Sequence, residues 1–343
     1  MKKKFLQILK YLLFLGLGVF LVWWSLQQIP PDKWDDFRKA FSTANYALLF
    51  PVFFILLLSH FLRAVRWKML ILPLGHNPSL TNTFFAVMIG YLANLAVPRL
   101  GEVLKCTILA KYENVPADKL LGTIFAERAF DMLCLILVFV LAFALQFKVI
   151  GEFGIRLLKK LFVSQSGNFN TSKIAIAIAI VVAIVFLITI LFRRYSNFKF
   201  IRIVRDIVKG IWQGIISVKD MKQKWSFIFA TAGIWIMYLL GTWIGFYATA
   251  GTAGSSLATA VSTLAFASVG MIITPGGIGA YPVLLAKVLQ LHDIPYAIGL
   301  ANGTLQWFAQ FLIIIFVGFI CLGLLPYYNK KTKNNEKARN HSI

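Results

Sequence analysis

Acidic residues are scarce in this chain of 343 residues, with 13 Asp and Glu against 35 Lys and Arg. Histidine and cysteine are rarer still, at four and three copies. The three cysteines (Cys106, Cys134 and Cys321) are scattered through apolar sequence, which excludes a disulfide framework. Neither the cysteines nor the histidines have the spacing of metal ligands, so we expect no metal site and no cofactor.

Apolar sequence is what the chain has in excess. Hydrophobic residues make up 59% of it and charged residues only 14%, whereas a soluble domain carries roughly a quarter charged residues. The sequence therefore predicts an all-α polytopic membrane protein. The basic excess fits cytoplasmic loops and anionic lipid headgroups. It does not indicate nucleic acid, because no recognition helix or aromatic-basic module accompanies it.

Six apolar stretches approach or exceed the roughly 20 residues that cross a bilayer. They lie at 5–26, 46–62, 117–147, 173–192, 225–249 and 296–325. The first has a basic flank but no small-residue cleavage site, so we expect a retained anchor. We assign 1–329 to one membrane domain and 330–343 to a basic cytoplasmic tail. Apolar positions at helical spacing in 198–215 predict an amphipathic basic helix on the membrane surface, with a solvated connector as the alternative.

The distribution of basic residues predicts the orientation. The clusters lie at Lys2–Lys4, at Arg63, Arg66 and Lys68, through 193–224, and in the tail. If all are cytoplasmic, both termini are cytoplasmic as well. Two further segments, 80–116 and 254–295, then enter and leave on the same side, and they do so from opposite sides of the membrane. Lys148 and the basic residues that follow it do not fit this scheme, which places them outside.

Each of these two segments is broken by proline and glycine, and the breaks correspond. Pro116 precedes Glu127 by eleven residues, and Pro295 precedes Gln306 by the same interval. Paired broken segments of opposite orientation are typical of inverted-repeat transporters with a mid-membrane site. We predict about six full spans plus two broken or re-entrant helical hairpins in an inverted repeat. Chance proline spacing and hairpins that cross fully are the alternatives.

Charged residues gather where the first hairpin meets the next span. "AVPRLGEVLK" supplies Arg99, Glu102 and Lys105, and "AERAFD" supplies Glu127, Arg128 and Asp131. Glu127 and Asp131 stand four residues apart and share a helix face. An unpaired charge at this depth costs at least about 2.5–3.5 kcal/mol, so we expect ion pairs between the two sets. A structural ion network and a polar cavity for a headgroup or protons are both compatible with this pattern.

The second half offers fewer charges. A helix that restarts after "TPGGIGAYP" would aim backbone N–H groups near Gly276 and Gly277 at a phosphate. Gln306 belongs to a stripe of amide side chains that favours interhelical hydrogen bonds over ligand binding. Lys287 would either meet a phosphate or extend toward the membrane surface. We expect Asn94, one turn before the first break, to satisfy backbone carbonyls that the break frees.

Three motifs in order, "NLAVPRLGEVLKCTILAK", "ERAFD" and "TPGGIGAY", resemble the transmembrane flippase-like family that includes the membrane domain of lysylphosphatidylglycerol synthases. The resemblance covers roughly residues 10–325. It implies a bacterial plasma-membrane protein that moves a lipid between leaflets. The positions that match the family's polar residues are Arg99, Glu102, Glu127, Arg128 and Asp131.

The sequence departs from that family in two places. A glutamate commonly follows the glycine motif, where this chain has Pro282, and an arginine sits in the final span, where this chain has Gln306 or Trp307. These changes put in doubt any mechanism that needs charges from both halves. Only about eighteen residues follow Leu325, so we expect neither a soluble aminoacyl-transfer domain nor synthase activity.

We therefore expect a lipid flippase or transporter for an anionic or amino-modified phospholipid, or for a lipid-linked polar headgroup. Its partners would be membrane phospholipids with anionic headgroups, and self-association into a homo-oligomer stays open. Without a GxxxxGK[ST] loop, transport would run downhill or be coupled to protons. A membrane-embedded lipid-modifying transferase and a non-catalytic partner subunit are the alternatives.

Overall fold

The computed structural model describes residues 16–97, 99–147 and 221–340, with side chains up to residue 331. The described part is helical and contains no strand. The predicted span 173–192 and the predicted surface helix 198–215 lie outside it. The helix Gly16–Gln27 is the described part of the first predicted span.

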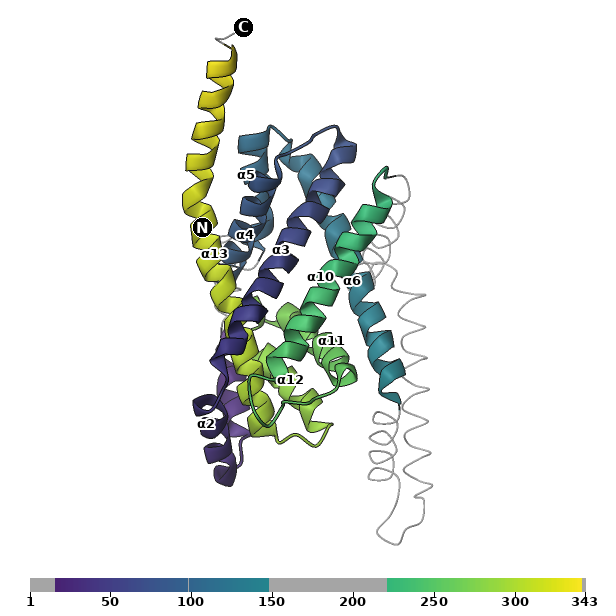
Figure 1. The fold of residues 1–343 in the computed structure, drawn as a ribbon, viewed down its shortest axis with the longest axis vertical. Coiled ribbons are helices and arrows are strands. Elements are labelled where there is room, and N and C mark those ends of the chain that lie inside the picture. Colours follow the sequence, from purple (N-terminus) through teal and green to yellow (C-terminus); the bar gives the residue numbers. More distant parts are fainter. Residues whose placement is uncertain (1–15, 98, 148–220, 341–343) are drawn as a thin grey trace, which may run out of the picture.

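Four long helices confirm the remaining four predicted spans by length and apolar composition. They are α3 (Leu49–Ile71), α6 (Ala117–Leu145), α10 (Lys224–Phe246) and α13 (Tyr296–Asn340), and they run lengthwise through the molecule (Figure 1). The chain is thus a multi-pass membrane protein. α13 contains Pro326 and continues to Asn340, so helix extends through most of the range that we assigned to a tail.

Two helical hairpins occupy opposite ends of the molecule (Figure 1). The first consists of α4 (Leu80–Ala96) and α5 (Leu100–Glu113). The second consists of α11 (Leu257–Ile273), the short 3-10 helix η4 (Pro275–Gly277) and α12 (Ala280–Gln290). The second arms have only 14 and 11 residues. At about 1.5 Å per residue, neither arm crosses a hydrocarbon core of about 30 Å by itself.

The two hairpins begin in the same way. Ser79 and Ser256 cap the 17-residue helices α4 and α11, and each serine hydroxyl accepts a hydrogen bond from the N–H group three residues later, at 3.2 and 3.1 Å. Each capping hydroxyl satisfies one of the free N–H groups at a helix start. Both first arms end in an extended residue, and a left-handed residue follows two positions later, Arg99 (φ 67°) or Gly276 (φ 61°).

The arms of the first hairpin approach each other through glycine. A Cβ atom added to Gly101 would overlap the carbonyl oxygen of Gly90 on the facing helix. The tips of the two hairpins also meet, because a Cβ on Gly276 would lie 2.8 Å from the Leu95 side chain. The two helix breaks therefore lie next to each other.

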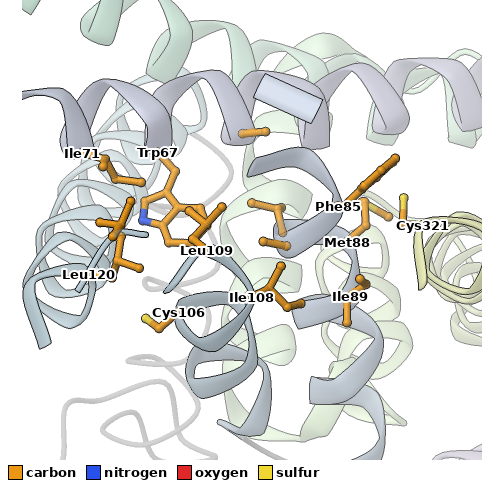
Figure 2. Packing of buried hydrophobic residues seen from close by; sticks show 14 of the residues in the cluster. Trp67, Ile71, Phe85, Met88, Ile89, Cys106, Ile108, Leu109, Leu120 and Cys321 are labelled. Carbon is orange, nitrogen blue, oxygen red and sulfur yellow. The ribbon is translucent and has the colours of Figure 1, made fainter. Parts of the chain in front are cut away.

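The main apolar core holds the first hairpin in place. Figure 2 shows Trp67 and Ile71 of α3 facing residues of α4 and α5, with Leu120 of α6 and Cys321 of α13 at the margins. Trp67 is fully buried. Because lipid is as apolar as these side chains, close packing rather than exclusion of water stabilises such an interface.

A short helix, α2 (Trp34–Ser42), lies between the first two predicted spans. Trp34 and Phe37 pack against a small buried cluster that contains Tyr296 at the start of α13. Asp35 and Asp36 lie in the first turn of α2. An aromatic face beside acidic and basic residues is suited to the membrane–water boundary.

Candidate functional site

A network of five charged side chains joins α3, α5 and α6. Asp131 accepts ion pairs from Arg66 at 2.8 Å and from Arg63 at 2.9 Å. Glu127 Oε2 lies 2.8 Å from Lys105 Nζ, and Glu127 Oε1 lies 3.4 Å from both arginines. The sequence predicted that Glu127 and Asp131 need partners, and the structure supplies three cations from two different helices.

The network forms because helical spacing places its members in register. Arg63 and Arg66 stand three residues apart on α3, and Glu127 and Asp131 stand four apart on α6, so each pair presents one face to the other helix. Arg66 is fully buried and Glu127 is 4% exposed. Leaving a buried charge without its partner costs several kcal/mol, so the pairs depend on one another.

Arg63 and Arg66 differ in how many of their N–H groups have hydrogen-bond partners. Arg63 donates its Nε–H to the Tyr238 hydroxyl of α10 at 2.8 Å. The Nε and Nη1 groups of Arg66 are buried and have no hydrogen-bond partner within the described part of the chain. Such groups are uncommon in folded proteins and call for an explanation.

Lys105 is held from two sides. Besides its ion pair with Glu127, its ammonium group lies 4.5 Å from the centre of the Trp67 ring. The Trp67 indole donates to the hydroxyl of Thr123 on α6 at 2.9 Å. A cation over an indole face is attracted by the ring quadrupole, more strongly when water is excluded.

A polar pocket adjoins the buried network. It is lined by Val87, Gly90, Tyr91, Asn94, Gly101, Glu102, Lys105 and Arg128. In the pocket, Arg128 pairs with Glu102 at 3.1 Å, and the two side chains are 49% and 31% exposed. Lys105 belongs to both the pocket and the network. The pocket therefore connects surface-accessible charges with the buried ones.

Asn94 has a different role from the one that we predicted. Its side-chain oxygen accepts a hydrogen bond from the N–H of Gly101 at 2.8 Å. It thus satisfies an N–H group in the first turn of α5, whereas we expected it to bond carbonyls. The first four N–H groups of a helix have no partner within the helix, which explains the need.

Arg99 stands apart from the ion network. We expected it to pair with the charges of α6, but it is exposed at the hairpin turn. It makes no ion pair with any residue that the structure describes. Its left-handed backbone is uncommon for a residue with a side chain.

Gln306 is held by hydrogen bonds within α13 and to two neighbouring helices. Its amide nitrogen donates to Asn302 at 2.8 Å and to the carbonyl of Thr242 on α10 at 3.3 Å. Tyr281 of α12 donates to its side-chain oxygen at 3.3 Å. These bonds correspond to the interhelical interpretation of the amide stripe.

The other predicted residues of the second half do not enter the pocket. Gly277 donates its N–H to the carbonyl of Thr274 at 3.0 Å, and Trp307 donates to the carbonyl of Gly276 at 2.7 Å. The exposed Lys287 lies over the Tyr296 ring at 4.5 Å. Within the described residues, no group of His, Cys, Asp and Glu side chains could hold a metal ion.

The sequence interpretation was wrong about Arg63 and Arg66. We assigned them to a cytoplasmic basic cluster because the predicted span ended at residue 62. α3 instead continues to Ile71, and both arginines lie within it, buried and ion-paired. The available signal was "LRAVRWKMLI", where apolar residues continue after each arginine.

No curated protein and no solved structure matches the chain. One family model does match, that of the lysylphosphatidylglycerol synthase TM region, over residues 7–318. Since the match covers most of the sequence, the chain belongs to the family of the lysylphosphatidylglycerol synthase transmembrane region.

Proposed function

We propose that this protein moves a phospholipid between the leaflets of a bacterial plasma membrane, by transport rather than by group transfer. The observation that carries the proposal is the buried ion network of α3, α5 and α6, which shares Lys105 with a small polar pocket. A family defined by the membrane region of a lipid synthase supports a lipid as the ligand.

The free-energy cost of burying these charges supports a functional role for the network. Replacing a buried ion pair by well-packed apolar residues is often neutral or stabilising. Membrane-embedded charges therefore tend to mark ligand or ion pathways. Here they lie close to a helix break whose end contacts the second hairpin, and irregular backbone at membrane depth is tolerated where it packs against protein or lines a wet cavity.

The likeness of the two hairpins supports a transport cycle. Their first arms have the same length and the same serine cap, and each ends in an extended residue that a left-handed residue follows two positions later. We propose that they form an inverted repeat with re-entrant hairpins, whose tips meet between Leu95 and Gly276. Rocking of one repeat against the other would open the pocket to each leaflet in turn. In this proposal both termini are cytoplasmic.

Lipid movement in liposomes tests the proposal. Purified full-length chain would be reconstituted with phospholipids labelled on an acyl chain, and an impermeant quencher would be added outside. The quencher reaches only the outer leaflet, which holds about half of the label. With native protein we expect more than this half to be quenched, because labelled lipid moves outward. We expect Glu127→Gln to abolish the excess, because Lys105 and both arginines then face one carboxylate fewer. The double variant Lys105→Met/Glu127→Gln restores the charge balance and should be equally inactive.

Lys287→Met is the matched control, because this lysine also lies 4.5 Å from an aromatic ring but outside the pocket. It should move lipid at the native rate. If native protein behaves like empty liposomes even with a pH gradient imposed, transport of those lipids is refuted. If a folded double variant transports normally, the network is structural only.

A further inference from the structure

The tips of the two hairpins differ in how much protein covers them. Aligned by their serine caps, Ser79 and Ser256, residues 91–104 of the first hairpin correspond to residues 268–281 of the second. In the first range only Gly101 is buried among the 13 residues that the structure describes, whereas six of the 14 residues in the second range are buried. Because burial resists local opening, the first tip is the less firmly held of the two.

Close backbone contacts hold the second tip on three sides. A Cβ atom added to Gly270 of α11 would lie 2.8 Å from the backbone of α12, and one added to Gly303 of α13 would lie 2.9 Å from it. A Cβ on Gly279 would lie 2.8 Å from the carbonyl oxygen of Gly18 in the first helix. Glycines let helices pack this closely within a membrane, so the second tip is fixed to three separate helices.

The glycine contact of the first tip lies between its own two arms, where Gly101 faces Gly90. It therefore joins the arms to each other rather than to the rest of the protein. Val97 and Arg99 at the turn are exposed. Arg99 has a left-handed backbone (φ 67°) at the position where the second hairpin has Gly276 (φ 61°), and this conformation is costly for a residue with a side chain. Exposure and backbone strain together are typical of a segment that changes conformation.

An ion pair near the surface ties the first tip to α6. Glu102 lies 3.1 Å from Arg128, with the two side chains 31% and 49% exposed. Among the described residues, no other ion pair involves the tip. The pair lines the polar pocket, which has room for about one water molecule. Exposed ion pairs contribute little to stability, so this tie can break at small cost.

The buried ion network does not depend on that tie. Arg63 and Arg66 pair with Asp131 at 2.9 and 2.8 Å, and both lie 3.4 Å from Glu127. All four residues belong to α3 and α6. A movement of the tip therefore leaves both buried carboxylates with cationic partners, which avoids the large cost of an uncompensated buried charge.

We propose that the tip of the first hairpin, residues 91–97 and 99–104, is a gate that lifts away from α6 when the Glu102–Arg128 pair breaks. It hinges at Gly90 and Lys105, where the buried parts of the two arms begin. The second hairpin stays fixed and is the stop against which the gate closes. Opening widens the pocket beyond the volume of one water molecule. This inference deepens the proposed transport cycle by assigning its motion to one hairpin, and it rests on that proposal.

Hydrogen–deuterium exchange of the detergent-solubilised full chain, measured by mass spectrometry, tests the inference. Because the two tips contact each other, they lie at the same depth, and the detergent shields them alike. We expect the amides of residues 91–104 to exchange at least about tenfold faster than those of residues 268–281, since the first tip opens locally and the second does not. Equal exchange in the two ranges would overturn the inference.

Variants of the ion pair distinguish a gate from general destabilisation. Glu102→Gln and Arg128→Gln should each speed exchange in 91–104 about two- to fivefold, as for loss of an exposed ion pair, and leave 268–281 unchanged. The double variant should be no faster than the faster single variant, because it removes the same tie. Faster exchange in both ranges, or in neither, would overturn the inference. Lys287→Met, at an exposed position of α12, is the control expected to change neither range.

The exchange and transport experiments fail separately. A mobile first tip without lipid movement would refute the transport proposal and leave the gate standing. Lipid movement by a chain whose two tips exchange alike would refute this inference alone.

Discussion

At the scale of single residues, Glu127 has the largest number of partners in the ion network. Lys105, Arg63 and Arg66 all lie within 3.4 Å of its two oxygens. Asp131 offers a second carboxylate to the arginines but is not paired with Lys105. Loss of the Glu127 charge therefore affects Lys105 most directly, because this lysine has no other carboxylate among the described residues.

This difference predicts a coupling between Glu127 and Lys105. Glu127→Gln should lower the free energy of unfolding by about 3–5 kcal/mol, because it leaves a buried cation without its counter-charge. Lys105→Met should cost a similar amount. The double variant should lose clearly less than the sum, which thermal unfolding of all four proteins in detergent would measure. Additive losses would show that the contact between the two side chains contributes little.

At the scale of elements, the first hairpin depends on close contact between its two arms. Gly101, in the first turn of α5, lies against the backbone of Gly90 on α4, and the Asn94 side chain bonds the Gly101 N–H. The contact fixes how α5 leans on α4 and therefore where Lys105, one turn further along, enters the network. Hairpin packing and site geometry are thus coupled.

Gly101→Ala tests that coupling. The added methyl group would overlap the Gly90 carbonyl, so one helix must move, and we expect a loss of about 3 kcal/mol in the free energy of unfolding. Gly122→Ala in α6 is the matched control, because a Cβ there meets nothing within 4 Å. It should gain about 0.5–1 kcal/mol from lower chain entropy. Equal thermal stability of the two variants would contradict the close packing.

At the scale of the whole molecule, the buried charged side chains and the exposed apolar side chains occupy different regions. Among the described residues, the buried ion pairs belong to the first hairpin and its neighbours, while the second half is joined by amides such as Gln306 and Asn302. Large apolar side chains are exposed on the outer faces of the long helices. In water this surface would drive aggregation, whereas in a bilayer it is the face that contacts lipid.

A substitution on that outer surface tests the membrane setting. Phe316, in the apolar part of α13, is 67% exposed. In lipid, Phe316→Arg should cost about 2.5–3.5 kcal/mol, because a charge at the bilayer centre is poorly solvated. Phe316→Leu should have little effect. The fraction of each variant recovered in the membrane measures this. Equal recovery of the arginine variant would mean that this face of α13 does not contact lipid.

The sequence by itself determined the existence of four long spans, the two broken segments and the set of charges that begins at Glu102 and ends at Asp131. These features follow from local composition and helical spacing, which are properties of neighbouring residues. Only the tertiary structure decided which charges meet. Arg63 and Arg66 entered the network and Arg99 did not, because pairing depends on how α3 and α6 cross and on which face each helix turns inward. No local pattern contains that crossing, since it results from packing between helices that are distant in the sequence.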